Sequence, residues 1–497
     1  MRQSLCLAAI FGDHMVLSRG KNVRIFGQAR GGAAVTVTIA GQRAEAAAKN
    51  GRFEAVLAPM DAGGPHTLTV TDGETTLRFT DVLIGDVYFA GGQSNMEWPL
   101  EQALGGPELV KTLDHPLIRY VNFPHNAWLD ESALAEERRM RWKPFAPGRC
   151  GDVSAVACHF ALELQPAIGV PVGIIDCYWG GTSAACWADE PALRQITAGT
   201  ELLEEYAARI AGKSDAQYEA EMRAYNEAYQ AWWGRVHALQ AVDPDMPWPE
   251  INEKAGQCPW PQPDGRKSAF RPAGLAETMV KRVAPYTLTG ILYYQGEEDT
   301  RHPHRYRCLL ETVISFWRDL FRDVSLPFLF VQLPMYIATG EADAKNWPPV
   351  REAQERVYRE LRNTGLAVLI DCGELDNIHP KDKKTVGHRL YLHAMRVVYG
   401  RELDGESPRA AHARREGNAL LVTLSAPVSF RGGPALFELA GADGVYHPAA
   451  AGVRGTVLTL TAEGVDRPVS ARYAWVNYGI VRAFGENGLP LAPFLIT

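Results

Sequence analysis

Five short and nearly continuous apolar runs constrain the fold of this chain more than any other feature. They are GDVYFAG, PVGIIDCYWGG, TGILYYQGEED, LPFLFVQLP and GLAVLIDCGE, between residues 85 and 374. A strand that is apolar along its whole length must be covered on both faces, which is typical of a parallel sheet packed between helices. Segments of helix length and helical periodicity, such as YRCLLETVISFWRDLFRD and KKTVGHRLYLHAMRVVYG, separate the runs. The sequence therefore predicts an α/β domain.

Both ends of the chain have a different pattern. Residues 15–79 contain NVRIFGQA, AVTVTIAG, GRFEAVLA and HTLTVTDG, which alternate apolar and polar residues between Gly- and Asp-containing turns. This pattern predicts a small β-sandwich. From about residue 405 the pattern returns in ALLVTLSAPVSF, GTVLTLTAEG and RYAWVNYG. We expect a second β unit there, with packing against the first as one arrangement.

These changes of pattern divide the chain into three predicted parts. We expect an N-terminal β-sandwich over residues 1–84, an α/β domain over 85–402 and a C-terminal β domain over 403–497. A charged, Ala-rich stretch followed by a Trp/Pro-rich stretch, about 201–270, predicts one or two long helices inserted over one edge of the sheet. A length of 497 residues suits such a division, because it exceeds what one ordinary core accommodates.

Composition excludes several classes of partner. The formal net charge is -7, and no basic stripe is present to neutralise a nucleic-acid backbone. No apolar run approaches the roughly 20 residues that span a bilayer. We therefore expect neither a nucleic-acid nor a membrane partner, and the sequence leaves the oligomeric state open.

The N-terminal stretch MRQSLCLAAIFGDHMVLSRG resembles a weak signal peptide, but its apolar part is short and no small-x-small cleavage site follows. We interpret it as the first strand of a domain and expect a cytoplasmic protein, or a periplasmic or secreted one if the N-terminus was trimmed. The eight cysteines form no C-x-x-C pair. This suits buried thiols better than a disulfide framework or a zinc site.

Ser94 is the first candidate for chemistry. In FAGGQSNMEW it follows the first apolar run and two glycines, and a helix is expected after it. The carboxyl end of a strand in a parallel sheet is where such sheets bind ligands. A capped turn would use the same residues, so this motif needs a partner elsewhere in the chain.

His379 provides that partner. It lies in ELDNIHPKDKKTVGHRL, after the last apolar run and before a helix, and Asp376 precedes it by three residues. A serine nucleophile needs a base and the base needs a group that orients it, so Ser94, His379 and Asp376 form a candidate triad. An Asp-capped turn with a surface histidine is the alternative for this second motif. Together, at the ends of the first and last strands of one sheet, the two motifs favour catalysis.

Two further stretches are expected at the same edge of the sheet. YWGGTSAACW follows one apolar run, and YYQGEEDT ends another. The backbone N–H of Gly181, the Gln295 amide and the N–H of Ser94 itself would make three donors for an oxyanion hole. The alternative to an oxyanion hole is a structural role, in which the glycines permit turns and the glutamine caps a helix.

We expect no cofactor and no metal. The one pattern that suggests a metal is His302-Pro303-His304, near Glu297 and Asp299. A His-Pro-His loop is usually a solvated turn, and its spacing does not imply the geometry of a metal site.

Four blocks together resemble a known family. GGQSNMEWPL, PVGIIDCYWGGTSAACW, YYQGEEDT and DNIHP are similar, in this order, to the signature blocks of the sialate O-acetylesterase group of SGNH (GDSL-like) hydrolases. The N-terminal FGDHMVLSRGKNVRIFGQA and the closing RYAWVNYG and GLPLAPF also resemble that group. The resemblance covers nearly the whole chain except about residues 201–270.

The resemblance implies a flavodoxin-like three-layer α/β/α hydrolase domain and a metal-independent serine esterase that removes acetyl groups from sugars. Ser94 matches the nucleophile, His379 the base, Asp376 the carboxylate of D-x-x-H and Gly181 the glycine donor of the second block. The third block departs from the family pattern, because many relatives have an oxyanion-hole Asn where this chain reads Q-G-E. Gln295 stands there, followed by Glu297 and by Asp299 where many relatives have Asn. Either acid would support the histidine or bind sugar hydroxyls.

The expected partner is an O-acetylated sugar or oligosaccharide. Tryptophans near the motifs, Trp98 and Trp179 among them, would form the floor of a sugar site, although core packing is the commoner role of such residues. A sialic acid substrate carries a carboxylate, for which Arg351 in WPPVREAQERV is a candidate, against a plain helix-surface arginine. Acetylated sialic acid is the first expected substrate, and acetylated xylan or another acetylated glycan is the alternative substrate. A carbohydrate-binding protein with an inactive site is the alternative from a different class.

Overall fold

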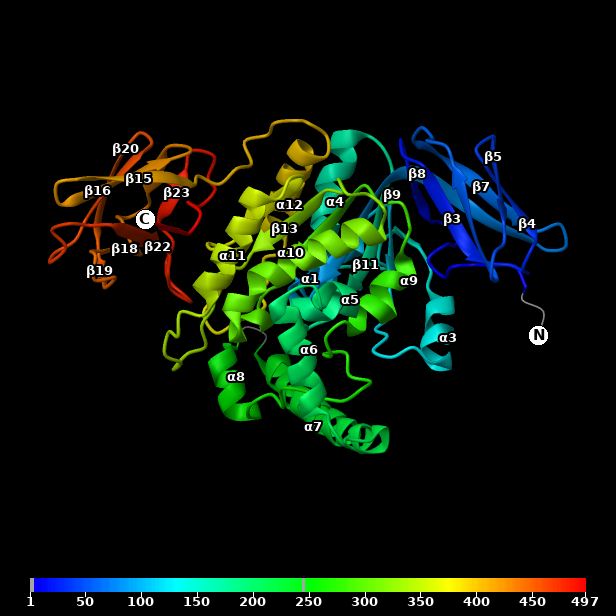
Figure 1. Ribbon diagram of the computed structural model, residues 1–497, viewed down its shortest axis with the longest axis horizontal. Coiled ribbons are helices and arrows are strands. Elements are labelled where there is room, and N and C mark those ends of the chain that lie inside the picture. The colour runs from blue at the N-terminus through cyan, green and yellow to red at the C-terminus, as the bar shows by residue number, and fades with distance from the viewer. Residues whose placement is uncertain (1–3, 244–245) are drawn as a thin grey trace.

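The computed structural model describes residues 4–243 and 246–497. Three parts follow one another along the long axis of the molecule (Figure 1). An N-terminal β-rich part lies at one end, an α/β part in the middle and a C-terminal β-rich part at the other end. The expectation that the two β units pack against each other is therefore wrong, because the α/β part separates them.

The middle part is built on a parallel sheet, as the apolar runs predict. Its strands are β8 (Thr76–Gly92), β9 (His115–Asn122), β11 (Val172–Tyr178), β12 (Gly290–Tyr294), β13 (Phe328–Gln332) and β14 (Thr364–Val368), with β10 (Lys143–Phe145) antiparallel at one edge. Their spatial order is β10-β9-β11-β8-β12-β13-β14. The segment β11-β8-β12-β13-β14 has the flavodoxin-like order 2-1-3-4-5, which confirms the predicted fold class.

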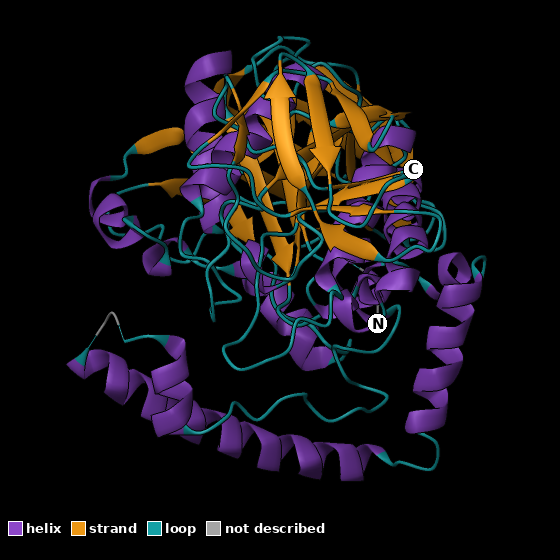
Figure 2. Ribbon diagram, turned by 90° about the vertical axis from the view of Figure 1, so that its left-hand side faces the viewer, coloured by secondary structure: helices purple, strands orange, loops and turns teal. Residues whose placement is uncertain are grey.

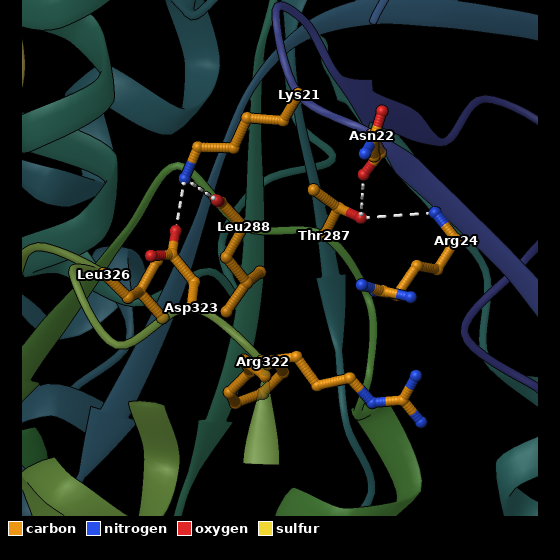
Figure 3. Close-up of a pocket in the computed structure, with 9 residues that line it drawn as sticks. Lys21, Asn22, Arg24, Thr287, Leu288, Arg322, Asp323 and Leu326 are labelled. Carbon is orange, nitrogen blue, oxygen red and sulfur yellow. Dashed lines mark hydrogen bonds and ion pairs between the residues drawn. The ribbon is translucent and has the colours of Figure 1, made fainter. Parts of the chain in front are cut away.

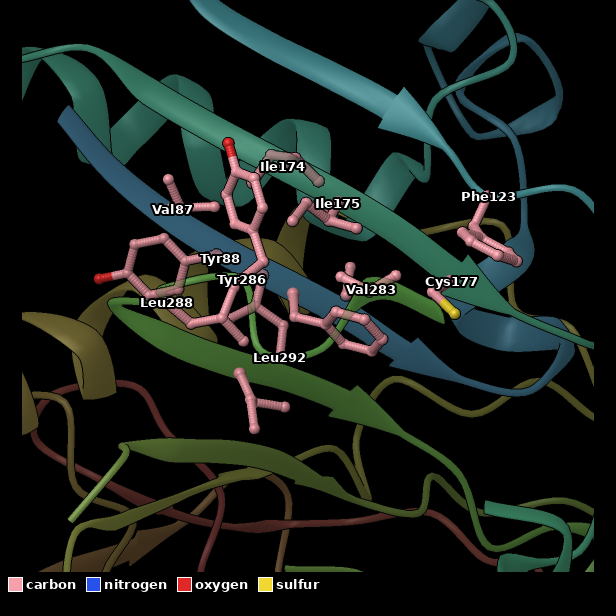
Figure 4. Close-up of a cluster of buried hydrophobic side chains, with 14 of the residues drawn as sticks. Val87, Tyr88, Phe123, Ile174, Ile175, Cys177, Val283, Tyr286, Leu288 and Leu292 are labelled. Carbon is pink, nitrogen blue, oxygen red and sulfur yellow. The ribbon is translucent and has the colours of Figure 1, made fainter. Parts of the chain in front are cut away.

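Helices on the sheet explain why these strands are apolar throughout. Helices α4 (Ala155–Ile168) and α12 (Lys384–Val397) pack together, as do α10 (Pro303–Leu320) and α11 (Trp347–Glu360). Every residue of β11 to β14 is buried. Figure 4 shows part of the resulting core, in which side chains of β8, β11 and β12 meet Val283, Tyr286 and Leu288.

The N-terminal part contains two sheets. One joins β1 (Cys6–Leu7), β3 (Val23–Gln28) and β6 (Arg52–Leu57); the other joins β2 (Val16–Ser18), β4 (Ala34–Ile39), β5 (Gln42–Ala47), β7 (Gly63–Thr71) and the first half of β8. The N-terminal stretch thus forms a strand where one was expected. Strand β8 pairs with β7 and then continues into the central sheet beside β11. The expected boundary at 84/85 falls inside this strand, and the division into three domains stays a prediction.

The stretch 201–270 extends away from the sheet as helices (Figure 2). They are α6 (Thr197–Arg209), α7 (Asp215–Val242) and α8 (Trp248–Ala255). Trp232, Val236, Ile251 and Ala255 form a small separate core between α7 and α8. The remaining short helices are α1 (Ser94–Glu97), η1 (Leu100–Gln102), α2 (Gly106–Thr112), α3 (Glu131–Arg139), η2 (Ala184–Trp187), α5 (Glu190–Leu193), the π-helical turn η3 (Ala276–Val280), α9 (Lys281–Val283) and η4 (Glu298–Arg301).

The C-terminal part has its own core and three small sheets. Their strands are β15 (Ala410–Glu416), β16 (Ala419–Leu424), β21 (Val457–Thr461) and β20 (Ala450–Arg454); β17 (Val428–Phe430) and β23 (Ala483–Gly485); and β19 (Tyr446–Pro448), β18 (Phe437–Ala440), β22 (Ser470–Tyr473) and β24 (Phe494–Ile496). The core includes Met335, Val368 and Ile370 of the α/β part. The C-terminal unit is therefore packed against the α/β part.

All eight cysteines are free thiols. Cys150, Cys158, Cys177 and Cys186 are buried as expected, whereas Cys6 is exposed because it lies on an edge strand. In the part of the chain that the structure describes, no helix is long and apolar enough to cross a membrane.

A pocket of about 180 Å³ lies between the N-terminal part and the amino ends of β12 and β13 (Figure 3). Its lysine Lys21 donates to Asp323 Oδ2 at 2.9 Å, and Arg24 and Arg322 share Glu54. Its cations are thus paired with acids. The pocket lies away from the carboxyl ends of the strands, where Ser94 is found.

Candidate active site

The structure brings Ser94 and His379 together. Ser94 begins α1 directly after β8, and His379 lies in the loop between β14 and α12. Ser94 Oγ and His379 Nε2 are 2.8 Å apart, although 285 positions separate the two residues. The ring of Trp98 stacks on the imidazole with centroids 5.2 Å apart. The predicted proximity of this hydroxyl and this imidazole is confirmed.

Glycines make the turn into Ser94 possible. Gly92 has φ +132°, and a Cβ there would lie 2.1 Å from the carbonyl oxygen of Tyr294 on the neighbouring strand. A larger residue would push β8 and β12 apart at the point where the nucleophile candidate emerges. Gly92 is therefore required by close packing as well as by the turn, and Gly91 by packing alone, because a Cβ there would lie 2.6 Å from the Trp317 ring.

Two backbone N–H groups, one of Ser94 and one in the adjoining loop after β11, are free to donate. A Cβ on Gly180 would lie 3.2 Å from Ser94 Cβ, so the loop after β11 runs directly beside the serine. Within residues 4–243 and 246–497, neither the N–H of Ser94 nor that of Gly181 donates a hydrogen bond. Both are available to a negatively charged oxygen, as expected for an oxyanion hole.

The environment of His379 favours the neutral imidazole. Burial lowers the pKa of His379 to about 3, and the nearby positive charge of Lys383 adds to this shift. A neutral imidazole with Nε2 facing a hydroxyl is the form that accepts a proton.

Asp376 has a different partner from the predicted one. Its carboxylate accepts hydrogen bonds from the N–H and the hydroxyl of Thr339. Among the described residues, Nδ1 of His379 has no hydrogen-bond partner. Asp376 has φ +64° in a tight loop, and this conformation and the Thr339 contacts direct its carboxylate to the neighbouring loop. The predicted hydrogen bond between Asp376 and His379 is absent from this structure.

Gln295 also differs from its predicted role. Its amide Nε2 donates to Asp299 Oδ2 at 2.5 Å and lies 3.2 Å from both Gln93 Oε1 and the Thr182 carbonyl. Gln295 is 1% exposed. Three buried acceptors thus engage its two N–H bonds, and none is left for an oxyanion in this geometry.

Asp299 is part of the same buried cluster. Its Oδ2 accepts from the Gln295 amide and from the N–H of Ala184 at 2.9 Å. Burial raises the pKa of Asp299 to about 6. The carboxylate ties the loop after β12 to the loop after β11, and its contacts do not reach His379.

Glu297 belongs to a buried chain of polar groups under the serine. Asn95 Nδ2 donates to Glu297 Oε1 at 2.5 Å and to the Ile378 carbonyl at 3.0 Å, and Asn95 Oδ1 accepts from Lys383 Nζ at 2.5 Å. Burial raises the pKa of Glu297 to about 7, and burial lowers that of Lys383 to about 7. Asn95, the residue after Ser94, is therefore bonded to Ile378, the residue before His379, and also joins Glu297 to Lys383.

Trp98 and Trp179 lie at the predicted edge of the sheet. Trp179 stacks on His125 with ring centroids 4.4 Å apart. His125 Nε2 lies 3.5 Å from Glu97 Oε1, and Glu97 Oε2 accepts from the N–H of Gly180 at 2.6 Å. An acid, an imidazole and an indole thus form a partly exposed wall beside Ser94.

Arg351 lies away from this site. It is fully buried in α11, and its guanidinium donates to the carbonyls of Ala474 and Val476 in the C-terminal part. It therefore does not reach a substrate carboxylate beside Ser94, and its contacts are those of an interface between two parts of the chain.

The His-Pro-His pattern starts helix α10. His302 precedes that helix, and Pro303 is its first residue. No group of three or more His, Cys, Asp or Glu side chains that could hold a metal ion occurs within the described ranges.

Sequence reasoning missed three residues of the site that lie inside the quoted blocks. Asn95 directly follows Ser94, and Glu97 and Lys383 follow Ser94 and His379 by three and four positions. Ser94 and Glu97 lie on the same helical turn of α1, and their spacing of three residues would have marked Glu97 as a neighbour of Ser94. His379 and Lys383 lie in the loop before α12, where spacing gives no such signal. Trp260, described below, gave no such signal.

Comparisons with known proteins find similarity to carbohydrate esterases. The family model described as "Carbohydrate esterase, sialic acid-specific acetylesterase" matches residues 270–395. The sialate O-acetylesterase of Rattus norvegicus is 27% identical over 433 residues, which cover 79% of this chain and 73% of that protein. The human enzyme of the same name is 26% identical, over 81% of this chain and 72% of that protein.

A solved structure is similar over nearly the whole chain. The crystal structure of a carbohydrate acetylesterase from Xanthomonas citri has a TM-score of 0.78 and 29% identity, and covers 99% of each chain. The similarity includes both β-rich ends as well as the α/β part. The chain is therefore a carboxylic ester hydrolase, a carbohydrate esterase similar to the sialate O-acetylesterases.

Proposed function

We propose that this chain hydrolyses O-acetyl esters of sugars through an acetyl-enzyme, with Ser94 as nucleophile and His379 as general base. The observation that carries the proposal is the 2.8 Å distance between Ser94 Oγ and His379 Nε2. The free N–H groups of Ser94 and of Gly181 in the adjoining loop support it, because acyl transfer needs donors for the developing oxyanion.

The reaction has two steps. Ser94 Oγ attacks the acetyl carbonyl while His379 Nε2 takes the hydroxyl proton, and the resulting oxyanion accepts from the two N–H groups. When the tetrahedral intermediate collapses, the imidazolium gives its proton to the departing sugar oxygen. Water then attacks the acetyl-serine with His379 again as base, and acetate leaves. No metal or cofactor takes part in these steps.

The third member of the triad stays a prediction. Asp376 lies three positions before His379, and the family resemblance assigns it the orienting role. In this structure its carboxylate is bonded to Thr339. The proposal therefore rests on Ser94 and His379 alone, and the contribution of Asp376 is a separate question.

Release of p-nitrophenol from p-nitrophenyl acetate tests the nucleophile. We expect Ser94→Ala to lower kcat by about four orders of magnitude or more, because one triad member is lost. Ser132→Ala, on the exposed side of α3, is the matched control and retains full activity. Equal activity of Ser94→Ala and wild type would refute the mechanism, and an inactive wild type would favour a binding protein on this fold.

Acetylated sialic acid is the first candidate substrate, because the relatives matched over most of their length are sialate O-acetylesterases. A neutral acetylated glycan, such as acetylated xylan, is the second. Two observations favour the second: Arg351 is buried elsewhere, and the charged side chain found beside Ser94 on the exposed wall is the acid Glu97. Acetate release from O-acetylated sialic acid and from acetylated xylobiose, compared by kcat/KM, distinguishes the two.

A further inference from the structure

We infer that the insertion over residues 201–270 supplies a sugar-binding wall, in which the indole of Trp260 stacks against the sugar ring of the ester substrate. The opposite wall consists of Glu97, His125 and Trp179. This inference rests on the proposed function and names the part of the molecule that selects the sugar.

The first observation is the position of Trp260. A Cβ built on Gly181 would lie 2.3 Å and 2.7 Å from two atoms of the six-membered ring of Trp260. A Cβ on the preceding Gly180 would lie 3.2 Å from Ser94 Cβ. The indole therefore covers the glycine that carries the proposed oxyanion donor, one residue away from the contact with the nucleophile. The absence of side chains at both glycines allows this approach.

The second observation is exposure. Trp260 is 39% exposed, and no other Trp, Tyr or Phe among the described residues is exposed. An isolated exposed aliphatic side chain needs no explanation, but burial is the usual state of so large an aromatic group. Its contact with Gly181 places this exposed side chain at the proposed reaction site rather than on a remote surface.

The third observation is that the Trp260 loop is held in place. Phe270 packs edge-on against the indole with centroids 5.3 Å apart. The loop end is tied to α6 and α7 by Arg209 to Asp264 at 2.8 Å and by Lys267 to Glu219 at 2.8 Å. A platform for a ligand benefits from such support, because less conformational freedom is lost on binding.

The opposite wall offers polar partners. Glu97 Oε1 and His125 Nε2 are 3.5 Å apart, with 33% and 40% of their side chains exposed.

The two walls match the chemistry of a pyranose. The C–H bonds on one face of such a ring form an apolar surface that packs on an indole, and its hydroxyls donate to a carboxylate or exchange hydrogen bonds with an imidazole. Binding sites of this kind combine aromatic surface with a few placed polar groups. A neutral sugar fits both walls, and the carboxylate of Glu97 disfavours an anionic one.

The test compares two substrates in the full-length protein. For Trp260→Ala we expect kcat/KM on acetylated xylobiose to fall by about tenfold relative to kcat/KM on p-nitrophenyl acetate, chiefly through KM. Trp260→Phe keeps a flat ring and is expected to recover most of that ratio. Val242 is 85% exposed and is the last residue of α7. Val242→Ala is therefore the control within the insertion and is expected to retain both activities.

A second variant tests the opposite wall. Glu97→Gln keeps an oxygen for the Gly180 N–H and removes the negative charge, so we expect the ratio of kcat/KM for O-acetylated sialic acid to that for acetylated xylobiose to rise.

Three outcomes would overturn the inference. One is an equal loss of both activities in Trp260→Ala, which would make Trp260 a support for Gly181 only. Another is an unchanged ratio in that variant, and the third is an unchanged ratio in Glu97→Gln. Failure of the proposed function itself is distinguishable, because wild type would then release no p-nitrophenol from p-nitrophenyl acetate.

Discussion

The ammonium nitrogen of Lys383 lies 2.5 Å from Oδ1 of Asn95, the residue that directly follows Ser94. Lys383 is 1% exposed, and the amide of Asn95 connects it to the carboxylate of Glu297, to which Asn95 Nδ2 donates. A buried cation bridged to a buried acid by one amide is costly unless every group is hydrogen-bonded. This bridge joins the loops of the nucleophile and the base, so it affects both their geometry and their protonation.

Removing the charge of Lys383 is expected to move the acid limb of the pH–rate profile. Burial and then Lys383 lower the pKa of His379, and catalysis needs the neutral imidazole, so kcat/KM falls as the pH falls through that pKa. In Lys383→Met the electrostatic contribution is lost, the pKa of His379 rises, and the acid limb shifts to higher pH. Hydrolysis of p-nitrophenyl acetate from acidic to neutral pH measures the shift.

The control for that experiment is Lys384→Met, which removes the same charge from an exposed neighbour. We expect the acid limb of its pH–rate profile to lie at the same pH as in the wild type. An unmoved acid limb in a folded Lys383→Met protein would show that Lys383 does not act on the imidazole.

Glu297→Gln is expected to change how stability depends on pH. Burial raises the pKa of Glu297 from 4.5 to about 7, so the folded protein binds a proton that the unfolded chain releases between these values. This contribution to the free energy of unfolding is fully present below pH 4.5 and is lost as the pH rises through about 7. The variant lacks that loss, so its Tm falls less than that of wild type between pH 4.5 and 7. Thermal unfolding monitored by circular dichroism measures the difference.

The exposed Glu227→Gln, in α7, is the control for this prediction and keeps the wild-type slope. Parallel curves for Glu297→Gln and wild type would mean that the carboxyl does not titrate in this range.

Two variants separate the possible roles of Asp376. If it orients His379 during turnover, Asp376→Asn lowers kcat by about 10³-fold to 10⁴-fold, and Thr339→Val leaves kcat near wild type. If it only joins two loops, Thr339→Val loses the hydroxyl hydrogen bond and keeps the N–H one, Asp376→Asn weakens the same link, and both variants have small effects on kcat. The structure as it stands leads us to expect the second pattern, and steady-state kinetics on p-nitrophenyl acetate decides between them.

Gly181→Ala is expected to impair both stability and turnover. The residue has φ +73°, where an L side chain costs about 1–2 kcal/mol, and its Cβ would collide with the Trp260 ring. The resulting displacement moves the proposed oxyanion donor, so we expect kcat to fall by about a hundredfold. Gly234→Ala, in α7 with open space around it, is the control and is expected to be neutral or stabilising. Wild-type kcat in a folded Gly181→Ala protein would exclude this N–H from the oxyanion hole.

Much of the site could be predicted because local pattern and chain order carry it. Ser94 and His379 follow buried strands of one parallel sheet, and the carboxyl ends of such strands meet at one edge whatever the rest of the fold does. The proximity of Ser94 and His379 could be predicted because both follow such strand ends. The predictions for Asp376, Gln295 and Arg351 depended on which way a side chain turns, and in all three cases a nearer partner engages it: Thr339, Asp299 and the C-terminal part respectively.

The sequence by itself determined the α/β class, the strand that leads into Ser94 and the pairing of that serine with His379. Apolar periodicity and the placement of glycines are local properties of the chain, and few arrangements of strands and helices satisfy them. Only the tertiary structure decided that Asn95 links Glu297 to Lys383 beneath the site and that Trp260 covers Gly181. These contacts join segments far apart in the chain, and they depend on burial and on competition between partners, neither of which a linear pattern records.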